Sequence, residues 1–97
     1  MAPAAHPAHG SVDHALAVLL DPYSTAAGLV ATGPFILGGP DDYRVADHGY
    51  HRRLPEDVWV PSAAVVVEIV SPDDETYDKF GFYAAHDVDE LIVADPY

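Results

Sequence analysis

The sequence contains no cysteine, and its apolar runs are short. Without cysteine, neither a disulfide framework nor a thiolate metal site can form. The apolar runs are too short and too often interrupted to span a membrane, and the N-terminal residues have neither the basic start nor the apolar stretch of a secretory signal. These features lead us to expect a cytoplasmic protein with no membrane partner.

Basic residues are also scarce. The chain has 4 lysine and arginine residues against 16 aspartate and glutamate residues, which gives a formal net charge of −12. A protein that grips nucleic-acid phosphates normally carries a basic face, so this charge argues against DNA as a partner. Three of the basic residues, Arg44, Arg52 and Arg53, lie close together in sequence and could form a local basic patch.

The length of 97 residues fits one domain with a single modest core. Residues 1–10, rich in alanine, proline and histidine, are predicted to form a loose N-terminal segment, and residues 11–97 a single core domain. His6, His9 and His14 suggest a metal site, but their spacing does not place them on one helical face. We therefore expect these histidines to have no metal role.

Residues 11–21 are predicted to form an amphipathic helix. Ser11 can cap its start, and Pro22 is expected to end it because the residue before proline is pushed out of the α region. The apolar face of this helix is predicted to consist of Val12, Leu16, Leu19 and Leu20.

Two strands are predicted next. Residues 29–37 form the first, with a break at Gly33–Pro34, and residues 43–50 form the second, which residues 54–60 follow as a loop. In the second strand Asp47 falls on the same face as two apolar residues. The alternative is that Asp47 lies at a strand end and faces water.

The centre of the sequence is the stretch from residue 63 to residue 83. A continuous apolar run around Glu68 predicts a strand buried on both faces, and Ser71 and Pro72 then begin a helix expected to reach Ala85. A buried carboxylate needs a partner or a metal, so Glu68 is a candidate site residue. Alternatively, Glu68 lies near the strand end, where it reaches solvent or pairs with an arginine.

The lysine on the predicted helix also has two interpretations. A strand that carries an acid, a tight turn, and a helix that returns Lys79 toward that acid are typical of half of a metal-nuclease site. Lys79 also lies four residues after Glu75, which is the favourable spacing for a surface ion pair on a helix.

A last strand over residues 90–95 completes the predicted fold. A strand, a helix and a strand in succession suggest a right-handed crossover that places the last strand parallel to residues 63–70. The chain is therefore predicted to be an α/β protein with a mixed sheet flanked by helices, in the order αβββαβ.

Three segments carry a resemblance to a known family. They read DYRVAD, VVVEIVSP and DKFGFYAAHDVDELIVADP. With them the chain resembles the Uma2-like family, which belongs to the PD-(D/E)xK superfamily of restriction-endonuclease-like nucleases. The resemblance implies a restriction-endonuclease-like core, whose element order matches the predicted one, and an endonuclease that acts on DNA.

The resemblance also implies roles for individual residues. Asp47 and Glu68 match the metal-binding acids and would hold Mg²⁺, or Mn²⁺, through oxygen ligands. Lys79 matches the family's catalytic lysine on the helix, and Tyr83 matches a supporting tyrosine one turn later. In the usual superfamily pattern the lysine lies two residues after the second acid, where this chain has Val70.

Other departures from the family pattern suggest a second hypothesis. Ala46 stands where the motif has proline, and the chain resembles a family member truncated at both ends. Sheet edges left open by missing strands would pair with another chain, so we expect a possible homo-oligomer. The alternative to a nuclease is a catalytically inactive, acidic remnant of the fold or a protein-interaction domain.

Overall fold

The structure of the protein is a computed structural model that describes residues 7–70 and 80–95. The elements are α1 (Pro7–Ala26), β1 (Val30–Thr32), β2 (Phe35–Gly39), β3 (Asp42–Ala46), β4 (His48–His51), β5 (Trp59–Val60), β6 (Val65–Ile69), α2 (Phe80–Ala85) and β7 (Glu90–Ala94). The predicted start of the second helix at residue 72 lies outside the described residues.

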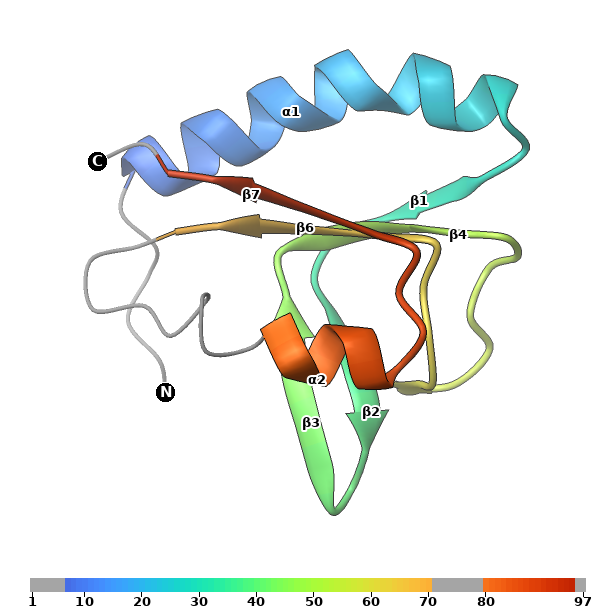
Figure 1. Cartoon of the computed structure of the whole chain (residues 1–97). Helices are drawn as coiled ribbons and strands as arrows, with labels where there is room; N and C mark the ends of the chain where they lie inside the picture. Colours follow the sequence, from blue (N-terminus) through green and yellow to red (C-terminus); the bar gives the residue numbers. More distant parts are fainter. Residues whose placement is uncertain (1–6, 71–79, 96–97) are drawn as a thin grey trace.

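Four strands form a mixed sheet in the order β1-β4-β6-β7. β1 and β6 both pair with β4 in antiparallel fashion, whereas β7 runs parallel to β6. The predicted parallel pairing of the last strand is therefore confirmed. Figure 1 shows α1 over one face of this sheet and α2 on the opposite side. The α/β class with a mixed sheet flanked by helices is confirmed as well.

The sequence does not predict the second sheet, which has the strand order β3-β2-β5. It forms because both strands expected in the first half divide. Residues 29–37 divide at Gly33–Pro34, since proline lacks the N–H that a ladder needs, and the two parts join different sheets. Residues 43–50 divide at Asp47, and here too the two parts join different sheets. Trp59–Val60, predicted to lie in a loop, pairs with β2.

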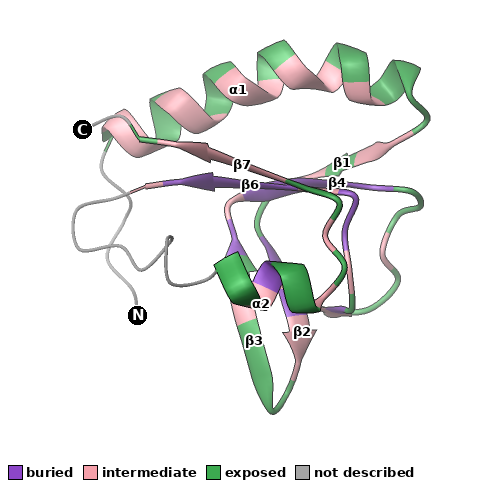
Figure 2. Ribbon diagram, in the orientation of Figure 1, coloured by how far each residue is buried: buried purple, intermediate pink, exposed green. Residues whose placement is uncertain are grey.

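The central strand β6 is buried on both faces, as predicted. Val66 packs with Tyr83 in a core cluster on the α2 side of the sheet. Val67 and Ile69 pack with Tyr50 in a second cluster on the other side. Three half-buried side chains of α1 cover this second cluster: Val12, Leu16 and Leu20. Figure 2 shows buried residues in β4 and β6, between the two helices.

Helix α1 is longer than predicted at both ends. It begins at Pro7, not at Ser11, and proline fits the first helical position because its missing N–H would have no partner there anyway. The prediction that Pro22 ends the helix is wrong, because α1 continues through it. Contacts with the sheet outweigh the local preference: the Tyr50 hydroxyl donates a hydrogen bond of 2.8 Å to Asp21, directly before this proline.

The apolar face of α1 also differs from the prediction in one residue. Leu19 is 59% exposed and points away from the sheet, whereas the other three predicted residues cover the core. Leu19 lies next to Leu20 in sequence, so the two are 100° apart around the helix and only one can face the sheet squarely. Within the described ranges, no helix is both long and apolar enough to cross a membrane.

Candidate active site

Glu68 is the last residue but one of β6 and is 2% exposed. Its side chain is on the same face of the sheet as that of Val66, so it projects toward α2. There the hydroxyl of Tyr83, itself 1% exposed, donates a hydrogen bond to Glu68 Oε1. A buried carboxylate is costly without such a donor, so this contact stabilises Glu68 where the sequence predicts a site residue.

Asp47 lies at the bend where the chain passes from one sheet to the other. The antiparallel register of β4 and β6 ends at His48 opposite Val67, and Ala46, which would continue it opposite Ile69, pairs with Phe35 in the second sheet. Asp47 Oδ2 accepts a hydrogen bond of 2.6 Å from the Ile69 amide. The side chain therefore supplies the acceptor that the neighbouring strand no longer provides.

This hydrogen bond places Asp47 beside the backbone of the second predicted acid. The amide nitrogen of Ile69 belongs to the peptide group that joins it to Glu68, so the Asp47 carboxylate lies directly beside the backbone of Glu68. Glu68 faces the α2 side of the sheet, whereas Asp47, directly before β4, also contacts His9 of α1, the helix on the other side. Both acids thus lie near the C-terminal end of the central strand, Asp47 bound to its backbone and Glu68 facing α2.

A residue of α1 completes this arrangement. His9 Nε2 donates a hydrogen bond of 2.9 Å to Asp47 Oδ1, and both side chains are largely buried, with 14% and 24% of their surface exposed. The sequence interpretation expected no metal role for His9, because the spacing of His6, His9 and His14 does not place them on one helical face. It did not consider a histidine that acts alone with partners from the sheet.

Two further polar contacts hold α1 against β4. Asp13 Oδ1 accepts a short hydrogen bond of 2.5 Å from His48 Nδ1, and Asp21 accepts the hydroxyl of Tyr50. Burial, together with the nearby Asp21 carboxylate, raises the pKa of Tyr50, which keeps this tyrosine protonated as a donor. A signal for these contacts exists in the sequence: His9, Asp13 and Asp21 recur at spacings of four and eight along one side of the helix.

The described residues include three of the four predicted site residues. Asp47 lies beside the Glu68 backbone, and Tyr83 contacts the Glu68 carboxylate. Lys79 and its alternative partner Glu75 lie outside the described residues, so both interpretations of this lysine stay predictions.

The oxygen atoms of Asp47 and Glu68 are of the type that Mg²⁺ prefers. Magnesium sites commonly use one or two carboxylates and complete their shell with waters and substrate phosphate oxygens. Each carboxylate oxygen has two acceptor positions, so the hydrogen bonds from His9 and Ile69 leave acceptor positions on Asp47. In the described part of the chain, no group of three or more histidine and acidic side chains forms a ready-made metal cage. The chemistry of these two carboxylates therefore suits Mg²⁺.

The arginines expected to form a basic patch are in different surroundings. The Arg44 guanidinium donates to Asp42 at 3.1 Å and lies 4.9 Å from the centre of the Phe82 ring. Arg52 pairs with Asp89. Because acidic side chains engage both arginines, these two positions contribute less positive potential than their sequence suggests.

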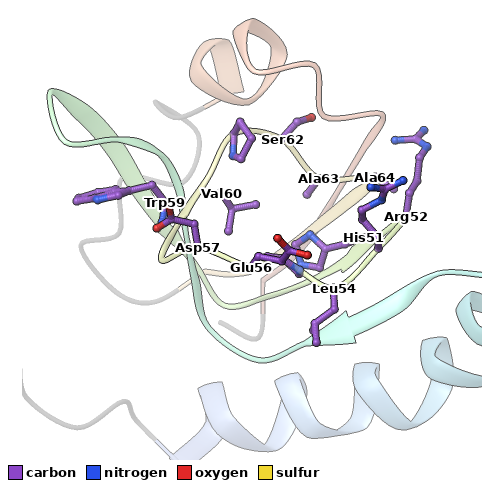
Figure 3. A pocket seen from close by; sticks show the side chains of 13 residues that line it. His51, Arg52, Leu54, Glu56, Asp57, Trp59, Val60, Ser62, Ala63 and Ala64 are labelled. Atoms are coloured by element: carbon purple, nitrogen blue, oxygen red, sulfur yellow. The ribbon is translucent and has the colours of Figure 1, made fainter.

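A separate cavity of about 400 Å³ opens along the segment between β4 and β6 (Figure 3). It is lined by residues 51–64 apart from Val58, and none of the predicted site residues belongs to its wall. Arg52, Arg53, Glu56 and Asp57 all line it, so its charged groups are of both signs. The sequence interpretation assigned this segment to a loop and predicted no cavity there.

His51 forms part of this wall and is 3% exposed. Its Nε2 lies 2.8 Å from the Thr32 hydroxyl, and its ring stands edge-on to Phe35. Burial lowers the pKa of His51, which favours the neutral ring. Among the described residues the Nδ1 atom has no hydrogen-bond partner.

The similarity of this chain to a known family extends over its full length. The model of the Uma2 family, described as "Putative restriction endonuclease", matches residues 1–97. No curated protein and no solved structure matches the chain. The family match spans Asp47, Glu68 and Tyr83 as well as Lys79.

Proposed function

Because the chain belongs to the Uma2 family of restriction-endonuclease-like proteins, we propose that it is a metal-dependent endonuclease that hydrolyses phosphodiester bonds in DNA. The observation that carries this proposal is the hydrogen bond from the Ile69 amide to Asp47, because it sets one acid beside the backbone of the other, Glu68. Carboxylates from two neighbouring strand positions would supply the oxygen ligands that Mg²⁺ prefers.

Asp47 and Glu68 would hold Mg²⁺ or Mn²⁺ in this site. The bound metal would supply a water of lowered pKa and would stabilise negative charge on the phosphate. The chain's own residues prepare the two acids for that task. The Tyr83 hydroxyl orients the Glu68 carboxylate, and the Ile69 amide orients that of Asp47. In the resemblance to the family, Lys79 is the group that would orient the attacking water or stabilise charge in the transition state.

The net charge of −12 bears on how DNA would bind. Repulsion between two polyanions weakens association, and divalent cations at the site and along the DNA reduce it. We therefore expect DNA binding to require the divalent metal.

The first test of the proposal is a titration of Mg²⁺ and Mn²⁺ that follows thermal unfolding. Because adjacent carboxylates repel each other without a cation, metal binding should stabilise the wild type, by about 2.7 kcal/mol at a metal concentration 100 times Kd. Glu68→Gln keeps an acceptor for Tyr83 but removes the charge, and it should lose most of this response. Glu56→Gln, at an exposed acid outside the site, is the matched control and should respond like the wild type.

Cleavage of supercoiled plasmid DNA is the second step of this test. The wild type should nick the plasmid in the presence of Mg²⁺ or Mn²⁺, and Glu68→Gln should not. An equal metal response in the wild type and in Glu68→Gln would contradict the proposal.

One observation favours a second candidate function. The carboxylates of Asp47 and Glu68 both accept hydrogen bonds from the protein, so they are stabilised without any metal. This supports a catalytically inactive domain that keeps the fold and the acids for structural reasons. Such a domain would show no metal response, and Glu68→Gln would lower stability by the same amount with and without Mg²⁺.

A further inference from the structure

The carboxylate of Asp47 is held at both of its oxygens. Oδ2 accepts the Ile69 amide at 2.6 Å, and Oδ1 accepts His9 Nε2 at 2.9 Å. A single hydrogen bond leaves a carboxylate free to turn about its last torsion angle, whereas two donors on different oxygens fix its plane. The first donor belongs to the central strand, and the second belongs to the N-terminal helix.

His9 is itself held in place. One turn later in α1, Asp13 bonds His48, the residue that follows Asp47 in sequence. The consecutive residues Asp47 and His48 are thus bound by two α1 residues four positions apart. In the first pair the helix supplies the histidine, and in the second pair it supplies the aspartate. Val12, between them, packs on the core below. The imidazole of His9 is therefore presented to Asp47 by a helix whose docking is fixed independently.

We propose that His9 is a positioning residue of the metal site, which holds the Asp47 carboxylate in the orientation that binds a divalent cation. This inference rests on the proposed function. Hydrogen bonds to the ligands of a metal are worth about 10–100-fold in metal affinity, because they remove motions that the ligand would otherwise lose on binding. The His9 donor occupies one acceptor position of Oδ1 and leaves a second position on the same oxygen for the metal.

A purely structural contribution of His9 makes a different prediction. If His9 only fastens α1 to the sheet, its removal lowers stability but leaves the affinity for Mg²⁺ unchanged. Asp13 provides the matched comparison, because its contact with His48 fastens the same helix turn to the same strand without touching Asp47. The comparison of His9 with Asp13 variants therefore separates positioning of the carboxylate from docking of the helix.

The experiment measures the Kd of Mg²⁺ by calorimetry in the full chain and in four variants. His9→Met, which has similar size and no donor, should raise Kd at least tenfold, and His9→Gln, whose amide can donate to Asp47, should restore it to within about threefold of the wild type. Asp13→Ala and His14→Ala, the latter at an exposed position of the same helix, should keep Kd within about twofold of the wild type.

A second measurement needs no metal. Hydrogen exchange of the Ile69 amide should quicken in His9→Met relative to Asp13→Ala, because the acceptor Asp47 loses one of its two restraints. This exchange measurement also tests the role of His9 if one variant is too unstable for calorimetry.

The outcomes separate the two proposals. A wild type that binds no Mg²⁺ overturns the proposed function and, with it, the role of His9. A wild type that binds Mg²⁺ with the same Kd as His9→Met overturns the role of His9 alone. Equal weakening in His9→Met and Asp13→Ala also overturns it, because helix docking then explains the loss.

Discussion

Asp47 shows how one side chain serves the fold and the candidate site together. It caps the end of the β4–β6 ladder by accepting the Ile69 amide, and it receives His9 from α1. Such a residue cannot be exchanged without a structural cost, even if it binds a metal. The sequence makes Asp47 and Glu68 candidates because both acids lie among apolar strand residues, and the resemblance to the family gives them their expected roles. It does not identify His9, because the partner of His9 lies 38 residues away and only the tertiary structure brings them together.

The buried histidine His51 leads to a prediction about pH. Burial lowers its pKa below the ordinary value of about 6.5, so under mildly acidic conditions the unfolded chain binds a proton that the folded chain does not. Its contribution to stability is therefore complete above pH 6.5 and is lost as the pH falls below that value. The expected slope is at most about 1.4 kcal/mol per pH unit.

Chemical denaturation of the wild type and of His51→Gln between pH 7.5 and pH 5 measures this contribution. Glutamine can still bond Thr32 but does not titrate, so the difference between the two curves isolates His51 from the other histidines. His14→Gln, at an exposed position, should follow the wild type. A difference curve that is flat with pH would contradict the prediction.

At the scale of elements, the boundaries predicted from sequence hold where local signals and packing agree. The apolar run and the turn signal after it both predict the central strand, and β6 confirms this prediction. The two strands before it were predicted as continuous, although each changes sheet within its length. No local signal in the sequence shows that the chain changes sheet at Asp47. The pairing of β3 with β2 and of β4 with β6 depends on tertiary contacts between distant parts of the chain.

Helix α1 allows a test of how packing against the sheet competes with local sequence preference. Pro22 lies inside the helix and is exposed to solvent. It therefore removes one backbone hydrogen bond of the helix without contributing to the core. Pro22→Ala should therefore raise the free energy of unfolding by about 1–3 kcal/mol. Pro40→Ala, in the exposed turn between β2 and β3, is the control and should give no such gain. Destabilisation by Pro22→Ala would mean that the bend at this proline is needed to seat Asp21 on Tyr50.

At the scale of the whole molecule, the dominant property is the net charge of −12. Like charges spread over a small domain repel one another and oppose the compact state. Composition alone predicts this repulsion, whereas the pairing of Arg44 with Asp42 and of Arg52 with Asp89 follows only from the structure. These exposed pairs are screened by salt and contribute little to stability.

Monovalent salt should therefore stabilise the protein. An increase in NaCl from about 20 mM to about 500 mM shortens the range of charge interactions to a few ångströms, and the melting temperature should rise. An equal osmolality of sucrose controls for general exclusion effects. A melting temperature that falls with NaCl would contradict this prediction.

The docking of α1 also sets the order in which the parts of the molecule can come together. The contacts of His9 with Asp47 and of Asp13 with His48 join residues 38 and 35 positions apart, and Asp47 is held in turn by Ile69, a further 22 residues along. Contacts between distant residues form late, because the chain must first close the loop between them. On the ribosome the first helix leaves the tunnel long before its partners. The residues of α1 are therefore made before the strands that bind them and dock only after those strands have formed.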